Sequence, residues 1–578
     1  MNILGINGLG INPAACLWQA GKLTALAAEE RFTRQKESFG MMPVGAAAWC
    51  LQQAKISLEQ IDAIAFGWYA PRYQFYMPFF VAKTALQYAS FNSDKGAFKN
   101  ALEQLAKYRP AAVRSALGKM CKAIDANVKV PPVYFYRHHL AHAASAYFAS
   151  GMEQAHIIVV DGSGEDKCTT IFSAQGEEIT QVETMQIPHS LGWFYQSITE
   201  WLGFTPNSHE GKTMALAAYG KYDADTMFKL QQMLSIDTDG AYSYNPRFSF
   251  AGKHTTGSVY STKLEALLGK ARAANSALLP YHYNVAYAAQ SLIESAMLGL
   301  LKRVTKLPNF NGNICLAGGV ALNCKMNGIL AAHPAVKNVF VPPVSSDDGT
   351  ALGAAMLHAK AMGINHRLSM QHAYYGPSFS DKEIEQALRQ TTMPFSLEPC
   401  IEKTAASALA QGKIIGWFQG AMEAGARALG NRSILAHPAI EGMSNKVNLQ
   451  VKNREAWRPF AASILCDAKD RLLLHAQHAP FMTIAFSTTA EAQQLIPEAI
   501  HTDGTTRPQL VTPEANYLYH RLISEFEKQT GIPALLNTSF NDKEEPIVCT
   551  PEQAVKTFLS TGLDALAIGN YWLQKDNT

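Results

Sequence analysis

Three histidines fall within five residues in the stretch RHHLAHAASAYF, which spans residues 137–148. On a helix, the side chains of His138 and His142 would share one face, because the two residues are four apart. That spacing suits two imidazoles bound to a single cation. His139 lies three residues before His142 and could compete for the role. The alternative is a polar helix start whose histidines pack in the core, and spacing alone leaves these possibilities open.

Two acidic loops favour the cation site. In IIVVDGSGED, Asp161 ends an apolar strand, and in VPPVSSDDGTALGAA, Asp347 stands just before a helix. Carboxylates at such strand ends can meet metals or phosphates, although Asp and Gly also favour ordinary turns. The stretch LAGGVALN adds glycines that admit close backbone approach. Together the three loops predict a nucleotide cradle, with the candidate residues Gly162, Gly164, Gly318, Gly319 and Asn323.

A third polar stretch is NSHEGKTMALAAYG, residues 207–220. Its Asn207, Glu210 and Lys212 stand before a small-residue helix and could orient a substrate or a phosphate. The alternative is a solvated helix start.

The second half of the chain holds the densest clustering of cationic residues among glycines and aromatics, in GARALGNRSIL, VKNREAWRPFAAS and TTRPQ. Guanidinium forks bind phosphate bidentately, whereas lysine acts as a point charge. Surface ion pairs are the alternative, but the apolar neighbours favour an anion site. The candidate ligands of a triphosphate or a phosphorylated small molecule are Arg427, Arg432, Lys452, Arg454, Arg458, Arg507, Asn537 and Ser539.

The elements that must position these residues follow an α/β pattern. Short apolar runs such as MNILGING, IDAIAFGWY and AHIIVVDG end in small or acidic residues and lead into helices. This alternation predicts an α/β fold with a ligand at the strand ends. Residues of about 75–130 are predicted to form a helical insertion. Periodicity lapses near 363–376, which predicts two domains, 1–366 and 372–578, and repeats of 20–50 residues are absent.

Composition excludes several classes of protein. With 578 residues, of which 48% are hydrophobic, the chain can bury more than one core. A net charge of +3 gives no basic field for binding long nucleic acids. The nine cysteines form no C-x-x-C pair, and no apolar run reaches the length of a membrane span. The first residues lack the features of a signal peptide. We expect a soluble cytoplasmic protein with no nucleic-acid or membrane partner.

These stretches together resemble the O-carbamoyltransferase family of natural-product biosynthesis, which includes tobramycin, cephamycin and nodulation-factor carbamoyltransferases. The resemblance runs almost from end to end. Besides the motifs above, it rests on EERFTRQK (29–36), PHSLGWFY (188–195), and NTSFN followed by EPIVCTPEQA.

The resemblance implies an N-terminal domain with the actin-like ATPase fold of threonylcarbamoyl transferases and a C-terminal YrdC-like domain. It also implies two chemical steps. Carbamoyl phosphate and ATP, with its Mg²⁺, give carbamoyl adenylate and pyrophosphate in the second domain. The first domain then transfers the carbamoyl group to a small natural product, at a hydroxyl or an amine, and releases AMP. A site closed to water would protect the labile adenylate. The identity of the acceptor and the oligomeric state stay open.

The family pattern also assigns residues. Its metal ligands match His138, His142, Asp161 and Asp347, and the expected metal is Fe(II) or another divalent ion. Lys36 matches a lysine near the transferred carbamoyl group. The positions that bind carbamoyl phosphate and ATP match Arg427, Lys452, Arg458, Arg507 and Ser539.

The sequence departs from the family pattern after the first strand. Ile11 and Asn12 stand where the family carries a His-Asp pair, and isoleucine cannot accept a proton. His209 or another group could substitute, the acceptor could be an amine, or the transfer site could be impaired and serve a binding or regulatory role. A tRNA threonylcarbamoylation enzyme is a further alternative, which the low net charge disfavours, and so is carbamoylation of a protein cysteine. A second departure is Glu544, where a glycine is usual.

Overall fold

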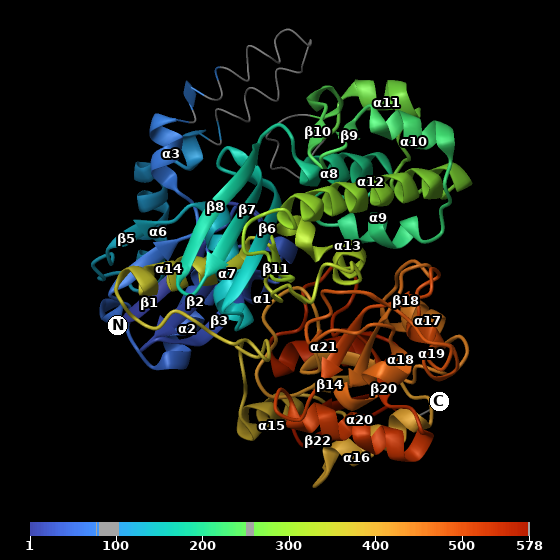
Figure 1. The fold of residues 1–578 in the computed structure, drawn as a ribbon. Coiled ribbons are helices and arrows are strands. Elements are labelled where there is room, and N and C mark those ends of the chain that lie inside the picture. Colours follow the sequence, from blue (N-terminus) through green and yellow to red (C-terminus); the bar gives the residue numbers. More distant parts are fainter. Residues whose placement is uncertain (77, 80–81, 83–102, 104, 250–258, 576–578) are drawn as a thin grey trace. The chain divides into compact units, whose positions relative to one another are not determined.

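The computed structural model describes residues 1–76, 78–79, 82, 103, 105–249 and 259–575. The chain divides into two compact units (Figure 1). The first comprises Met1–Thr24 and Glu37–Ser369, and the second comprises Ala25–Lys36 and Met370–Thr578. The predicted first domain, 1–366, therefore differs from the first unit, because a short segment near the N-terminus folds with the second.

Two five-stranded sheets form the frame of the first unit. One has the order β3-β2-β1-β4-β5, with β1 (Asn2–Asn7), β2 (Ala14–Gln19), β3 (Lys22–Ala28), β4 (Ala63–Phe66) and β5 (Val133–Phe135). The other has the order β12-β11-β6-β7-β8, with β6 (Gln154–Gly164), β7 (Lys167–Gln175), β8 (Glu178–Gln186), β11 (Asn313–Ala317) and β12 (Asn338–Phe340).

The two sheets repeat one topology. In each, the first strand pairs antiparallel with the second and parallel with the fourth, and the fourth pairs parallel with the fifth. The apolar runs expected as strands, including MNILGIN and HIIVVDG, are β1 and β6. The predicted α/β class is confirmed.

Two helices pack between the two sheets. The alanine-rich helix α7 (His138–Ser150) packs on β6 and β11, and α14 (Asp348–Ala361) packs on β1, β2 and β4. The two helices also pack against each other. Gly353 permits their close crossing, because a Cβ there would lie 1.8 Å from the carbonyl oxygen of Ala141. α7 ends at Gly151, which adopts the left-handed conformation with φ of +73° that glycine accepts without strain.

The remaining helices of the first unit surround this frame. They are α2 (Val44–Ala54), α3 (Ala70–Phe75), α6 (Pro110–Ile124), α8 (Leu191–Trp201), α9 (Glu210–Ala217), α10 (Ala224–Gln231), α11 (Thr262–Leu268), α12 (Pro280–Val304) and α13 (Cys324–Ala331). The long α12 packs against α8, α9, α10 and α13 (Figure 1), and a hairpin of β9 (Leu234–Ile236) and β10 (Tyr242–Tyr244) lies beside it. Within the predicted insertion of about 75–130 the structure has the helix α6, and α3 ends where the insertion begins, while 77, 80–81, 83–102 and 104 lie outside the described residues. Within the part of the chain that is described, no helix is long and apolar enough to cross a membrane.

The second unit is built on an eight-stranded mixed sheet of order β13-β22-β21-β14-β15-β20-β16-β19. Its strands are β13 (Phe395–Leu397), β14 (Ile415–Phe418), β15 (Arg432–Ala436), β16 (Ala461–Leu465), β19 (Pro508–Val511), β20 (Ala534–Ser539), β21 (Ala565–Ile568) and β22 (Tyr571–Gln574). A small hairpin pairs β17 (Phe486–Ser487) with β18 (Thr505–Thr506). The helices are α15 (Asp381–Arg389), α16 (Ile401–Ala410), α17 (Met443–Lys446), α18 (Lys469–Leu472), α19 (Ala492–Leu495), α20 (Tyr517–Thr530) and α21 (Pro551–Ser560).

The segment Ala25–Lys36 completes the second unit. It contains the short helix α1 (Glu30–Thr33). The backbone N–H of Leu26 donates to the carbonyl of Tyr375, and the guanidinium of Arg31 donates to the carbonyl of Gly425. Arg34 donates to two further carbonyls, those of Ile547 and Pro546.

Candidate metal centre and anion site

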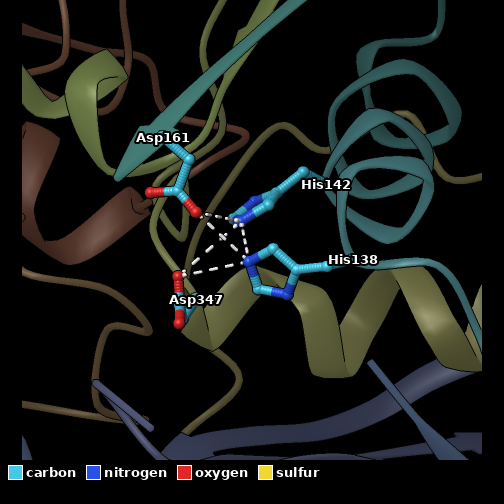
Figure 2. Close-up of side chains that lie close together, drawn as sticks. All are labelled: His138, His142, Asp161 and Asp347. Carbon is cyan, nitrogen blue, oxygen red and sulfur yellow. Dashed lines mark hydrogen bonds and ion pairs between the residues drawn. The ribbon is translucent and has the colours of Figure 1, made fainter. Parts of the chain in front are cut away.

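The four predicted metal ligands come together in the first unit. One ligand atom from each of His138, His142, Asp161 and Asp347 can be chosen so that all four atoms lie within 4.8 Å of one another. Figure 2 shows the four side chains pointing toward one another. The Nε2 atom of His138 lies 3.1 Å from Nε2 of His142 and 3.2 Å from Oδ2 of Asp161. Oδ1 of Asp347 lies 3.6 Å from Nε2 of His138 and 3.7 Å from Nε2 of His142.

The fold brings these residues from three elements to one point. His138 is the first residue of α7 and His142 follows one turn later, while Asp161 lies near the end of β6 and Asp347 stands immediately before α14. All four are buried. The N-termini of two helices meet here, and their partial positive charge stabilises the neighbouring carboxylates.

The donor set fits a divalent transition metal. Ligand atoms held about 2.0 to 2.2 Å from such a metal lie roughly 3 to 4.5 Å from one another, which matches the observed spacings. Imidazole nitrogen with carboxylate oxygen suits iron, manganese or zinc. Nδ1 of His138 lies 3.0 Å from the carbonyl oxygen of Gly67, so this nitrogen donates its proton there. The lone pair of Nε2 then points toward the other three side chains. Metal-binding histidines commonly donate their other ring N–H to a carbonyl in this way, which fixes the orientation of the ring.

The charges of the cluster favour a cation. Although burial alone lowers the pKa of His138, the carboxylates of Asp347 and Asp161 raise it to about 10. Burial would raise the pKa of Asp161, but hydrogen bonds and attraction from His138 and His142 hold it well below its usual range. Two ionised carboxylates therefore face two imidazoles in a buried place, and the same field that favours a proton on His138 favours a metal ion.

His139 lies outside the cluster. Its Nδ1 is 2.7 Å from the hydroxyl of Thr170 on β7, and its ring is buried. Burial and the neighbouring charge of His138 lower its pKa well below the usual value, so it is neutral. The geometry thus resolves the alternative that spacing left open, in favour of the two histidines four residues apart.

The predicted glycine loops support the metal ligands directly. The backbone N–H of Gly319 donates to Oδ1 of Asp161 at 3.1 Å, which orients that carboxylate. Gly318 has a φ of +91°, and a Cβ there would lie 2.2 Å from the carbonyl oxygen of Val160. Gly162 packs against Gly192 on α8, and a Cβ at Gly192 would overlap the backbone of Gly162. A nucleotide-binding role for these glycines stays a prediction.

Asn323 and Gly164 have defined internal contacts. The side chain of Asn323 caps α13 by accepting the N–H of Met326, and it exchanges hydrogen bonds with Gln290. Gly164 lies against the rings of His138 and His139, where a Cβ would come within 2.7 Å of ring carbons of both. These contacts explain both residue types through packing.

The segment with Ile11 approaches the metal cluster from another side. The side chain of Asn12 donates to the hydroxyl of Ser346, which directly precedes Asp347, at 3.2 Å. A Cβ at Gly10 would lie 2.9 Å from the hydroxyl of Tyr108 and 3.8 Å from Oδ2 of Asp347. The position that carries a histidine in the family pattern is therefore close to the cluster, and Ile11 gives it an apolar side chain.

Sequence reasoning missed the aromatic residues beside the cluster. The rings of Trp68 and His138 are 3.9 Å apart, and those of Trp68 and Tyr108 are 4.8 Å apart. All three rings are buried. Burial and the charge of Asp347 raise the pKa of Tyr108, which keeps its hydroxyl protonated. The carbonyl of the adjacent Gly67 also contacts His138, and none of Gly67, Trp68 and Tyr108 was singled out from the sequence.

The NSHEGK stretch places an acidic group at the start of α9. Oε1 of Glu210 accepts the backbone N–H of Asn207 at 2.6 Å, and Asn207 adopts a left-handed conformation with φ of +65°. Burial, helped by the charge of Glu37, raises the pKa of Glu210 to about 7. Lys212 lies one turn into the helix stretch, 5.5 Å above the ring of Phe204. The substrate-orienting role predicted for these residues stays a prediction.

A cluster of cations lies in the second unit. Nζ of Lys452 is buried and donates to the carbonyl oxygens of Ser539 and Asn541, each at 2.9 Å. Burial and the charges of Arg454, Arg458 and Lys36 hold the pKa of Lys452 well below its usual value. Because its hydrogen atoms already bind protein oxygens, Lys452 can offer a ligand mainly its charge.

Two arginines of this cluster, Arg458 and Arg507, have guanidinium N–H groups that could bind a ligand. Burial and the charge of Arg507 lower the pKa of Arg458, and within the part of the chain that is described its guanidinium makes one long contact, of 3.9 Å to Glu455. Nε of Arg507 is buried without a hydrogen-bond partner among the described residues. Burial and the charges of Arg458 and Arg507 also lower the pKa of Arg454, a member of the cluster that the family pattern did not assign. Cations held this close favour an anion between them.

Arg432 and Asn537 make hydrogen bonds within the second unit. The guanidinium of Arg432 is fully buried over the ring of Phe418, and it donates to four backbone carbonyls, those of Gln419, Asn431, Pro377 and Gly420. Asn537 is buried on β20 and donates to the hydroxyl of Ser463. Their side chains hold the scaffold together, and the phosphate-binding role predicted for Arg432 stays a prediction. Arg427 lies partly exposed in the loop before β15.

The loop after β20 retains a glycine-like backbone without glycine. Glu544 has a φ of +61°, which lies in the left-handed region that glycine occupies most easily. The family preference for glycine therefore has a conformational cause at this position. The loop keeps that conformation here with a glutamate.

Comparison with known proteins agrees with the two-part organisation. The model of the carbamoyltransferase N-terminus matches residues 2–356, and the model of the carbamoyltransferase C-terminus matches residues 406–575. An uncharacterized protein of Synechocystis sp. is 35% identical over 99% of this chain and 97% of its own length. Nodulation protein NolNO of Sinorhizobium fredii is 33% identical over 97% of this chain and 78% of its own length.

A second nodulation protein, NolO of Bradyrhizobium diazoefficiens, is 33% identical over 76% of this chain and 78% of its own length. Among solved structures, component A of (R)-2-hydroxyglutaryl-CoA dehydratase from Acidaminococcus fermentans aligns with 63% of this chain and 99% of its own, at 13% identity and a TM-score of 0.34. That structural likeness is too low to carry an argument. The family models and the nodulation proteins do: the chain belongs to the carbamoyltransferase family and is an enzyme that transfers carbamoyl groups.

Proposed function

We propose that this carbamoyltransferase forms carbamoyl adenylate from carbamoyl phosphate and ATP in its second unit. Its first unit then passes the carbamoyl group to a hydroxyl of a small molecule. The observation that carries the proposal is the separation of two charged sites. The first unit gathers buried carboxylates and imidazoles at one point, and the second gathers Lys452, Arg454, Arg458 and Arg507.

The cationic cluster suits the first step. Carbamoyl phosphate, ATP and water give carbamoyl adenylate, pyrophosphate and phosphate, so every substrate and product apart from water is an anion. Guanidinium groups bind such phosphates bidentately. A bound anion would favour the charged form of Lys452, whose pKa is otherwise lowered, and that charge would add to the attraction. Lys36 contributes through the segment that folds with the second unit, since its charge acts on Lys452.

The metal centre suits the second step. His138, His142, Asp161 and Asp347 would hold a divalent metal, with Fe(II) the expected ion. When bound, the metal supplies Lewis-acid stabilisation of the negative charge that develops on phosphate oxygens as AMP leaves. The chain itself orients Asp161 through the N–H of Gly319 and keeps the ligands out of water. Exclusion of water protects an adenylate from hydrolysis.

The proposal extends to the fold of each unit and to the acceptor. We propose an actin-like first unit, supported by its repeated sheet topology, and a YrdC-like second unit. A small-molecule acceptor is supported by the net charge of +3, which offers little attraction to a long nucleic acid. The carboxyl of Glu210, with its pKa near 7, provides a proton-accepting group elsewhere in the first unit.

One assay tests the proposal. The purified chain with divalent metal, ATP and carbamoyl phosphate should produce carbamoyl adenylate and pyrophosphate. Mass spectrometry detects both products. Replacement of Arg458 by alanine should lower adenylate formation by about 10²-fold or more, since a charged phosphate contact is lost. Arg471→Ala, at a surface ion pair with Glu491, is the matched control. Absence of adenylate with the unchanged chain would reject the first step. Adenylate that no hydroxyl compound consumes would reject the second.

A further inference from the structure

Glu165 is a buried carboxylate at the metal centre that donates nothing to the ligand set. It follows the glycine turn after Asp161, with a φ of +56° that is unusual for a residue with a side chain. Only 5% of its surface is exposed. A strained backbone and a buried charge are both costly, so contacts must compensate for them.

One oxygen of Glu165 binds two backbone N–H groups that are far apart in the sequence. Oε1 accepts the N–H of His138 at 3.1 Å and the N–H of Tyr69 at 2.8 Å. His138 is the first residue of α7, so its N–H has no partner within the helix. The carboxylate therefore caps the helix that carries two metal ligands.

The second N–H extends the effect to the ring of His138. Tyr69 directly follows Gly67 and Trp68, and both of these residues contact that ring. The carbonyl oxygen of Gly67 lies 3.0 Å from Nδ1, and the ring of Trp68 lies 3.9 Å from the imidazole. By holding Tyr69, Glu165 fixes the stretch that sets the orientation of the imidazole. By holding the N–H of His138, it fixes the backbone from which the imidazole projects.

The neighbouring residues reinforce this arrangement. Gly164 lets the turn lie directly against the His138 ring, since a Cβ there would come 2.7 Å from its Cδ2. Asp166 is fully buried and receives two hydrogen bonds of 2.5 Å from Arg72, which belongs to α3. The turn is thus fastened to α3 on one side and to α7 on the other.

We propose that Glu165 is a positioning residue for the metal centre: by accepting both N–H groups it sets the affinity and the coordination geometry at His138. This inference rests on the proposed metal site. It concerns hydrogen-bond acceptance, so an amide oxygen in the same place should serve as well as a carboxylate.

Cobalt(II) binding to the full chain tests the inference. Affinity is measured by competition with a chelator, and coordination geometry is measured from the d–d absorption of the bound ion. Glu165→Ala should weaken Co(II) binding by about 10- to 100-fold, as loss of an outer-shell partner does, and should change the absorption. Glu165→Gln should restore both to nearly the original values. Glu165→Asp has a shorter side chain that cannot reach both N–H groups, so its Co(II) affinity should lie between those of the alanine and glutamine variants. It replaces the alanine variant if that protein does not fold.

The matched control is Glu200, also in the first unit, whose Oε2 accepts the N–H groups of Val259 and Tyr260. Glu200→Ala should lower the melting temperature and leave Co(II) affinity unchanged. Affinity and absorption of Glu165→Ala equal to those of the unchanged chain would overturn the inference, and so would a glutamine variant as weak as the alanine variant. A failure of the metal site itself would differ from both, because the unchanged chain would then bind no Co(II).

Discussion

Two adjacent histidines differ in what they contact, although both are buried. His138 faces two carboxylates and a second imidazole, while His139 contacts Thr170. We expect His138→Ala and Asp347→Asn to lose bound divalent metal, by more than the roughly 10- to 100-fold typical of outer-shell changes. His139→Ala should retain it. Elemental analysis of the three purified proteins checks this, and equal metal content in all three would remove His138 and Asp347 from the ligand set.

Glu210 should make stability depend on pH. Its pKa is raised to about 7 in the folded chain, whereas an unfolded glutamate titrates near 4.5. Its contribution to folding is therefore fully present below pH 4.5 and is lost as pH rises through 7. Glu210→Gln keeps the acceptor for the Asn207 N–H and removes the titration. Between pH 5 and 8, the unchanged chain should lose roughly 3 kcal/mol relative to this variant. Urea unfolding of both proteins at pH 5 and pH 8 measures this difference. Equal changes in the free energy of unfolding of the two proteins would contradict the prediction.

Glu544 tests the cost of a left-handed backbone. Glycine would remove the strain at φ of +61° but would also gain freedom in the unfolded chain. These effects offset each other, so Glu544→Gly should stay within about 1 kcal/mol of the unchanged chain. Glu544→Val should lose about 1 to 2 kcal/mol, because a β-branched residue resists this conformation. Thermal unfolding distinguishes them, and a valine variant as stable as the glycine variant would disprove the expectation.

At the scale of elements, the loop after β11 depends on Gly318 for two separate reasons. The residue needs a positive φ, and its neighbour Val160 leaves no room for a Cβ. Gly318→Ala should therefore cost about 3 kcal/mol or more and weaken metal binding through Asp161. Gly363→Ala is the control, since Gly363 also has a positive φ but open space around it, and about 1 kcal/mol is expected there. Denaturant unfolding with metal titration checks both, and equal losses would contradict the steric argument.

The limits of sequence prediction also appear at this scale. The four-residue spacing in α7 and the acidic loops predicted that His138, His142, Asp161 and Asp347 come together, because helical periodicity and strand-end position are local properties. The burial of Arg432 and its bonds to backbone carbonyls could not be predicted, because β15 is buried along its whole length and its pattern RSILA does not show which residues reach a ligand. Glu165 stood inside a recognised motif, but its partners Tyr69 and His138 are distant in sequence. Contacts of that kind depend on how the sheets are placed.

At the scale of the whole molecule, the chain cannot be divided at one peptide bond into its two units. The fragment 370–578 lacks the segment Ala25–Lys36, whose Arg31 and Arg34 bind backbone carbonyls of the second unit. We expect this fragment to melt at a lower temperature than the same unit in the full chain. Added peptide 25–36 should raise the melting temperature of the fragment.

The control peptide replaces both arginines by alanine and should have little effect, since buried hydrogen bonds from charged donors contribute most of the contact. Differential scanning calorimetry of the fragment with each peptide measures the difference. The segment would be dispensable if the fragment melted at the same temperature as this unit in the full chain. Equal shifts in melting temperature with the two peptides would lead to the same conclusion.

The repeated sheet topology gives the first unit two halves whose first strands can be compared. At the end of its first strand, one half has Asn7–Gly10, with the sequence NGLG, and the other has Asp161–Gly164, with the sequence DGSG. Asp161 is a candidate metal ligand, while Asn7 binds the carbonyls of Ile11 and Asn12 and the indole of Trp68. The neutral residue thus holds Trp68, whose ring lies against His138, while the charged residue offers a ligand atom to the same cluster.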